Sequence, residues 1–298
     1  MRKKELNRLE INDTYSDFLS YWREARELPI ERKLEKWRSK YMADYPTLLN
    51  KQIEDYENKG FDWQQNAKNK VFPYLEERLP EMTRARGNLR KIIPVIYKRA
   101  CDFFELRPSI TAVIYVGTGC GAGWSTTLEG KPALLFGLEN IAESGWSDSR
   151  SLEGLVTHEL GHLFHERIRQ NSKLSIKDGP FWRLYKEGVA KWSEFGILDR
   201  ESWYEAKGLN DPGWLDWCRE NKSWLAEEFL LRVEKEKSVD QFFGSWYDLW
   251  GWKQTGYFLG YEAITNLTSS HNLTKLDIFK IANPSEQMKQ ALENLVKD

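Results

Sequence analysis

Aromatic and apolar residues recur at intervals of three and four along the first third of the chain. Phe18, Tyr21 and Trp22 form one such group. This spacing is typical of amphipathic helices, so residues 1–108 are predicted to be helical. Prolines restrict the backbone, and those of this segment are expected to mark helix starts or ends: Pro29, Pro46, Pro73, Pro80 and Pro94.

The pattern changes after Pro108. Residues 110–116 are mostly β-branched and run into a cluster of glycines at 117–123, which predicts a strand followed by a turn. Residues 132–138 predict a second strand, and the Gly130-Lys131 pair before it suits a hairpin. From about Ser151 the pattern is helical again to the end of the chain.

These elements predict an α+β fold, in which a small sheet is followed by helices. We expect three segments along the sequence. A helical N-terminal segment spans 1–108, a core with the sheet and two helices spans 109–200, and a helical part that closes a cleft spans 201–298.

Composition narrows the class of protein. The chain has 298 residues, and its 44 Lys and Arg nearly cancel its 45 Asp and Glu, so we expect neither nucleic acid nor an anionic membrane as a partner. The three cysteines form no CxxC pair, which favours reduced thiols over a disulfide framework. No apolar run follows the basic N-terminus or reaches membrane-spanning length. We expect a soluble, cytoplasmic protein; its oligomeric state is left open.

The stretch from Val156 to Leu163 contains an HExxH motif. On a helix, positions i and i+4 share one face, so His158 and His162 can bind the same metal ion. Apolar residues define a second face that should be buried, comprising Leu152, Leu155, Val156, Leu160, Leu163 and Ile168. Gly161 is a poor helix former, and its presence suits a site that another backbone approaches closely.

A catalytic zinc site needs a third protein ligand. The position six residues after His162 is Ile168, so a third histidine at that spacing is absent. His165 lies one further helical turn along the axis, too far to reach the same ion, and we expect it at the surface.

The segment Glu187-Gly188-Val189-Ala190, followed by Glu194, resembles the Glu-Gly-aromatic-Ala segment of the gluzincin clan of zinc peptidases. Within this clan the chain is most similar to an uncharacterised group of predicted zinc-dependent proteases. The resemblance covers roughly residues 151–262 and implies a thermolysin-like zincin core with one Zn²⁺ per chain. It implies that Glu187 is the third ligand, on a second helix reached through a loop at Lys177–Pro180.

The motif assigns Glu159 as the general base, because it follows the first ligand and is not itself a ligand. The resemblance further implies a tyrosine that stabilises the oxyanion, for which Tyr257 is the first candidate and Tyr261 the second. Packing tyrosines on an amphipathic helix are the alternative. Glu194 lies seven residues past Glu187, on the same helix face, and is a candidate partner for a ligand imidazole; a solvated helix charge is the alternative.

In this clan, an edge strand of the sheet binds the substrate backbone by strand addition. Residues 133–138 are the expected edge strand, with Leu135, Phe136, Gly137 and Glu139 as substrate-binding residues. Leu138-Glu139-Asn140 loosely matches the segment with which aminopeptidases bind a free α-amine, although a plain strand-to-helix connection fits equally well.

The sequence therefore predicts a zinc-dependent hydrolase of peptide bonds that acts on a peptide or protein substrate. Two alternatives stay open. One is an aminopeptidase of the same clan, and the other is a non-catalytic zinc-binding or regulatory domain on the same scaffold.

Overall fold

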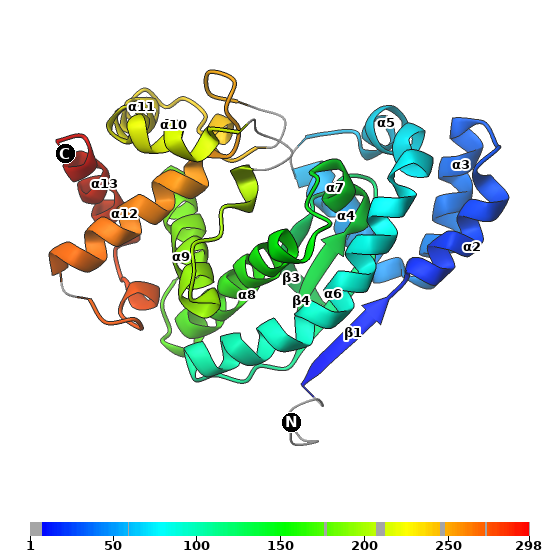
Figure 1. Cartoon of the computed structure of the whole chain (residues 1–298), viewed down its shortest axis with the longest axis horizontal. Coiled ribbons are helices and arrows are strands. Elements are labelled where there is room, and N and C mark those ends of the chain that lie inside the picture. Colours follow the sequence, from blue (N-terminus) through cyan, green and yellow to red (C-terminus); the bar gives the residue numbers. More distant parts are fainter. Residues whose placement is uncertain are drawn as a thin grey trace. The chain divides into compact units, whose positions relative to one another are not determined.

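The computed structural model describes residues 8–58, 60–175, 178–206, 212–244, 248–271 and 273–297. The fold is α+β and mostly helical, with one four-stranded mixed sheet (Figure 1). The chain divides into two compact units. Unit 1 comprises Met1–Lys98 and Arg107–Val156, and unit 2 comprises Arg99–Leu106 and Thr157–Asp298. The three-segment division along the sequence stays a prediction.

The sheet of unit 1 has the strand order β1-β2-β4-β3, in which β1 (Leu9–Asp13), β2 (Ile110–Tyr115) and β4 (Lys131–Gly137) are parallel. Strand β3 (Gly123–Leu128) pairs antiparallel with β4. The two strands join at Glu129 and Gly130, which both have positive φ, as a two-residue hairpin turn requires. A hairpin therefore precedes β4 as expected, but its turn lies at Glu129-Gly130 rather than at Gly130-Lys131, and its first strand, β3, was not predicted.

Helices of unit 1 flank this sheet. They are α2 (Tyr15–Ala25), α3 (Ile30–Lys36), α4 (Pro46–Asn58), α5 (Trp63–Asn66), the first part of α6 (Leu75–Phe104), and α7 (Leu138–Glu143). Short π and 3₁₀ turns connect them at Trp37–Tyr41, Met42–Asp44, Ala67–Val71 and Phe72–Tyr74.

Two expectations for the N-terminal part are wrong. Residues 9–13 form strand β1 rather than helix. Their backbone pairs in parallel with that of β2, and their side chains alternate between partly buried and exposed. Pro80 and Pro94 lie inside α6 and not at a helix end. Buried side chains such as Leu89 and Ile93 anchor this helix, and their packing outweighs the backbone hydrogen bonds that the prolines remove.

Unit 2 is helical. Its elements are the last part of α6, most of α8 (Ser149–Asn171), α9 (Pro180–Leu198), α10 (Trp214–Glu220), α11 (Lys222–Glu234), α12 (Thr255–His271) and α13 (Pro284–Leu295), with 3₁₀ turns at Tyr204–Ala206, Asp240–Phe242 and Ile278–Lys280. Helix α9 packs against both α12 and α13. The core of unit 2 contains aromatic contacts such as that of Phe104 stacked on Phe164, whose ring centroids lie 4.6 Å apart.

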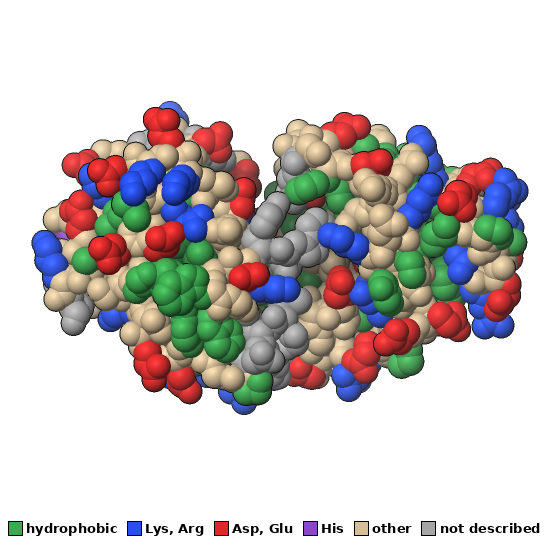
Figure 2. Space-filling model, turned by 90° about the horizontal axis from the view of Figure 1, so that it is seen from above, with side chains coloured by type: hydrophobic (Ala, Val, Ile, Leu, Met, Phe, Trp, Pro, Cys, Tyr) green, Lys and Arg blue, Asp and Glu red, His purple; other side chains and the backbone are tan. Residues whose placement is uncertain are grey.

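The surface carries charges of both signs. On the face shown in Figure 2, acidic and basic side chains are interspersed, and hydrophobic side chains gather in one area of unit 2. Among the residues that the structure describes, Trp250 is the most exposed large hydrophobic one, at 78%. No helix in the described ranges is long and apolar enough to cross a membrane.

Candidate metal centre

Helix α8 carries the HExxH motif. Asp148 begins it, since its Oδ1 accepts hydrogen bonds from the backbone N–H groups of Arg150 and Ser151, which the helix itself leaves without partners. The apolar face predicted from the sequence is confirmed, because all of its members are buried: Leu152, Leu155, Val156, Leu160, Leu163 and Ile168. This burial fixes the rotation of the helix about its axis.

Gly161 lets α9 approach α8 closely. A Cβ atom at this position would lie 2.6 Å from Ser193 Oγ and 3.1 Å from Ala190 Cα. Only glycine avoids this clash, as the sequence led us to expect. The close crossing aligns the middle of α9 with the two histidines.

The three predicted ligand side chains meet at one point. His158 Nε2 lies 3.2 Å from Glu187 Oε2, and His162 Nε2 lies 3.0 Å from the same oxygen. The two imidazole rings are nearly perpendicular, with centroids 4.7 Å apart. One ligand atom from each residue lies within 4.8 Å of the others.

This arrangement fits a zinc ion. Bonds of roughly 2.0–2.1 Å in a tetrahedron place neighbouring ligand atoms about 3.3 Å apart, close to the separations seen here. Two imidazole nitrogens and one carboxylate oxygen form a donor set that zinc prefers. The three residues are buried or nearly so, and such a set of buried donors is costly unless something bridges them.

Burial and neighbouring charges shift the pKa values of the three candidate ligands. Burial lowers the pKa of His158, but its contacts with Glu187 and Glu194 outweigh burial and raise the pKa to about 9. Burial dominates for His162 and lowers its pKa to about 4. Burial raises the pKa of Glu187, but His162, Lys186 and the imidazole hydrogen bonds hold it well below its usual value. A metal binds an imidazole only in its neutral form, so metal binding at His158 would release any proton that the ring holds.

Glu194 contacts the first ligand from behind. Its Oε2 lies 3.5 Å from His158 Nδ1, and its side chain is fully buried. The alternative of a solvated helix charge is wrong. Metal-bound imidazoles are normally oriented through their second ring nitrogen by a carboxylate in this position.

A second close helix crossing, between α9 and α12, determines where the two candidate tyrosines lie. A Cβ atom on Gly188 would lie 2.3 Å from the carbonyl oxygen of Gly260, so α9 and α12 meet backbone to backbone. Tyr257, on α12, then lies beside the site, with its ring 5.5 Å from that of His158. Tyr261 instead packs against Phe195 and Trp203, at 4.7 and 5.5 Å. The structure thus brings Tyr257 to the cluster, whereas Tyr261 has aromatic packing partners.

Glu159 is the remaining carboxylate of the motif. Its side chain is buried, and burial raises its pKa to about 7, against the opposing charge of His158. It forms no ion pair or hydrogen bond with another residue that the structure describes. A carboxylate that is free of partners and titrates near neutrality can accept a proton from a nearby water molecule.

His165 lies in the core rather than at the surface, which corrects the expectation for this residue. It is 2% exposed and packs against the rings of Trp182, Tyr185 and Phe279. Burial holds its pKa well below the usual value. Apolar contacts on three sides, which the motif alone does not reveal, account for its position.

In unit 1, the predicted substrate strand is not an edge strand. Strand β4 lies between β2 and β3, so its backbone pairs on both sides. Leu135 and Phe136 are completely buried. The expected strand addition at 133–138 is therefore wrong, because no free row of N–H and C=O groups remains there. The edge next to β4 is β3.

Glu139 and Gly137 have structural surroundings. A Cβ on Gly137 would lie 2.6 Å from the carbonyl oxygen of Gly121, so the glycine permits close passage of the loop. Glu139 is fully buried, and its Oε1 accepts the N–H of Gly119 at 3.2 Å. Burial raises its pKa to about 7, opposed by hydrogen bonds from backbone N–H groups, including that of Gly117. These contacts hold the glycine-rich loop against α7.

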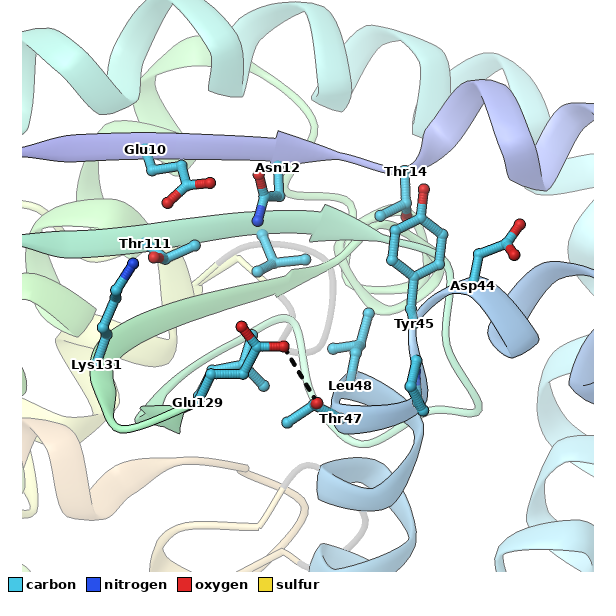
Figure 3. Close-up of a pocket in the computed structure, with 13 residues that line it drawn as sticks. Glu10, Asn12, Thr14, Asp44, Tyr45, Thr47, Leu48, Thr111, Glu129 and Lys131 are labelled. Atoms are coloured by element: carbon cyan, nitrogen blue, oxygen red, sulfur yellow. Dashed lines mark hydrogen bonds between the residues drawn. The ribbon is translucent and has the colours of Figure 1, made fainter. Parts of the chain in front are cut away.

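A separate hollow of about 180 Å³ lies on the sheet of unit 1 (Figure 3). Glu10, Thr111 and Lys131 line it from the strands, and Thr47 donates a hydrogen bond to Glu129 at 3.3 Å across its rim. Its walls are polar and carry both charge signs. It contains none of the predicted site residues.

Sequence reasoning missed two charged residues near the cluster. Lys191 Nζ lies 2.8 Å from Glu194 Oε2 and 2.5 Å from Glu205 Oε1, and all three side chains are buried. A signal for Lys191 existed, since it lies on the same turns of α9 as Glu187 and Glu194. Glu205 lies in the short turn Tyr204–Ala206, and no local pattern connects it to the helix.

The predicted loop before α9 falls partly on Lys177, outside the described residues; Pro180, which was expected in the loop, is the first residue of the helix, and Gly179 is its N-cap. Comparison with known proteins adds no relative to this picture. The chain matches no protein-family model, no curated protein and no solved structure.

Proposed function

We propose that the chain is a zinc-dependent hydrolase of peptide bonds with a thermolysin-like zincin core of the gluzincin type. The observation that carries the proposal is the convergence of His158 Nε2 and His162 Nε2 on Glu187 Oε2, at 3.2 and 3.0 Å. In the proposal these three residues hold one Zn²⁺. When bound, zinc lowers the pKa of water to about 7 and polarises a carbonyl group.

The chain's own groups supply the proton transfers. Glu159 accepts a proton from the attacking water and delivers it to the leaving amine, for which its pKa near 7 is suited. Tyr257 donates its O–H to the oxyanion that develops on the substrate. Burial keeps the pKa of this hydroxyl well above its usual value, so it stays protonated and able to donate.

Glu194 orients His158 through Nδ1 and keeps Nε2 aimed at the ligand point. The substrate is a peptide or protein. The burial of Glu139 among backbone N–H groups gives no support to its use as a binder of a free α-amine.

A single substitution tests catalysis apart from metal binding. Glu159→Gln removes the base but leaves the ligands, and we expect hydrolysis of a peptide library to fall by about 10²–10⁴ in kcat with zinc content unchanged. Glu166→Gln is the matched control, since this residue lies on the same helix but is exposed and seven residues away.

Other outcomes separate the alternatives. Equal hydrolysis by Glu159→Gln and wild type would contradict the assigned base. A zinc-loaded wild type that cleaves nothing would favour a binding or regulatory domain. Cleavage that is abolished when the peptide's N-terminus is acetylated would favour an aminopeptidase.

A further inference from the structure

Three charged side chains form a series of contacts that begins at the Nδ1 atom of His158. Glu194 Oε2 lies 3.5 Å from His158 Nδ1 and 2.8 Å from Lys191 Nζ, and Lys191 Nζ lies 2.5 Å from Glu205 Oε1. The exposed fractions of the Glu194, Lys191 and Glu205 residues are 0%, 0% and 1%. Water therefore screens none of these charges.

The ammonium group of Lys191 has a partner in every direction. Besides its ion pairs with the two carboxylates, it donates a hydrogen bond to the carbonyl oxygen of Ser202 at 3.2 Å. It also lies 4.4 Å from the ring of Tyr204 and 5.3 Å from that of Trp203. Lys191 thus joins the middle of α9 to the segment 202–206.

Stability alone does not explain this arrangement. Buried ion pairs gain little over apolar packing, because desolvation offsets their attraction. Here two carboxylates share one ammonium, and one of them, Glu194, also faces the imidazole of His158. This group of charges therefore acts directly on a candidate ligand of the metal ion.

We propose that Lys191 and Glu205 are positioning residues of the metal centre, which fix Glu194 behind His158 and tie the segment 202–206 to the presence of the metal. The inference rests on the proposed zinc site. In it, Lys191 sets the orientation of the Glu194 carboxylate, and Glu205 offsets the positive charge of Lys191 so that Glu194 can act on the imidazole.

The first consequence concerns affinity. Partners behind the ligands typically change metal affinity about 10–100-fold when removed, and we expect Glu205→Gln to raise the zinc dissociation constant by about tenfold. The second consequence follows from linkage, because a group that strengthens metal binding is itself held more firmly once metal is bound. Zinc should therefore slow amide hydrogen exchange at residues 202–206 in wild type. In Glu205→Gln, the factor by which zinc slows this exchange should be about tenfold smaller.

The experiment measures the zinc dissociation constant by competition with a chromophoric chelator for wild type, Glu205→Gln and Glu262→Gln. Glu262 is the matched control, since it is a partly buried carboxylate of unit 2 that pairs with Lys222 at 3.7 Å. The visible spectrum of the Co²⁺-loaded proteins reports the ligand geometry. We expect a weakened affinity and an altered spectrum for Glu205→Gln alone.

Glu205→Gln keeps the size of the side chain and leaves Lys191 paired with Glu194, so it is expected to fold; a thermal melt of the metal-free proteins checks this. Lys191→Met removes the ammonium that both buried carboxylates face. If this variant does not fold, the double variant Lys191→Met/Glu205→Gln takes its place. The double variant should also bind zinc about tenfold more weakly than wild type, because Glu194 is no longer held.

The outcomes are separable from those of the proposed function. If wild type binds zinc and Glu205→Gln matches it in affinity, Co²⁺ spectrum and exchange at 202–206, the three charges serve the fold only and the inference is overturned. If wild type binds no zinc, the proposed function itself fails.

Discussion

Each unit contains a completely buried glutamate, and the two carboxylates have different kinds of partner. Glu139 in unit 1 accepts a hydrogen bond from the backbone N–H of Gly119, and such backbone hydrogen bonds oppose the effect of burial on its pKa more strongly than the charge of Arg78 does. Glu194 in unit 2 faces the ammonium of Lys191 and an imidazole. Backbone N–H groups are fixed, so Glu139 is suited to holding a loop. Glu194, with charged side-chain partners, is instead suited to the proposed role beside a metal ligand.

The comparison teaches that burial of a glutamate does not define its role. Both residues were candidates from the sequence, one for substrate and one for support of a ligand. The groups that face each carboxylate distinguish them. Gly119 and His158 come from other elements, whereas Lys191 lies on the same helix as Glu194. The following changes would sharpen or break this distinction.

The largest effect is expected at the tyrosine beside the cluster. Tyr257→Phe removes the proposed hydrogen-bond donor to the oxyanion, and we expect kcat to fall by about 10²–10³. Tyr261→Phe is the matched control and should leave kcat nearly unchanged, because Tyr261 packs on Phe195 and Trp203. Steady-state kinetics on one peptide substrate decides. Equal decreases of kcat in the two variants would contradict the proposed role of Tyr257.

The second effect concerns pH and Glu139. Its pKa is raised to about 7 in the folded protein from 4.5, so between these values the folded state binds more protons than the unfolded state. The stability that this group contributes is full below pH 4.5 and is lost as pH rises through 7. The loss amounts to about 3 kcal/mol.

Glu139→Gln removes this titration. Relative to wild type, the variant should therefore gain stability between pH 5 and pH 8, measured by urea unfolding at both values. The exposed residue Glu77 provides a control, since Glu77→Gln should follow wild type. A constant difference between Glu139→Gln and wild type at the two pH values would contradict the account of this carboxylate.

The smallest effect compares two glycines with opposite surroundings. Gly188→Ala drives a Cβ into the backbone of Gly260 and should destabilise the protein by about 1–3 kcal/mol. Gly87→Ala, on an exposed face of α6 with nothing within 4 Å, should stabilise it by up to about 1 kcal/mol. Thermal unfolding of both variants tests the claim that α9 and α12 meet backbone to backbone at this glycine, the contact that places Tyr257 beside the site. A neutral Gly188→Ala would refute it.

The sequence contained the parts of the site that a helix encodes locally. The spacing of His158 and His162 sets them on one face, and the apolar face of α8 follows from the same periodicity. Glu187 came from a likeness to other proteins and not from spacing, and the geometry agrees with its assignment as a ligand.

Properties that depend on pairing between distant segments were not predictable. Strand β1 was missed because five residues in a polar stretch gain their structure only by pairing with β2. Strand order is equally non-local, which is why β4 was taken for an edge. Glu205 reaches Lys191 from a separate turn, and its role depends on a contact that no periodicity records.

The most direct test of the central claim is the zinc content of the purified protein, measured by elemental analysis for wild type, His162→Ala and Glu187→Ala. The account predicts one zinc ion per wild-type chain and its loss in both variants, because each removes one of the three ligands. A wild-type protein that carries no zinc and takes up none on addition would contradict it.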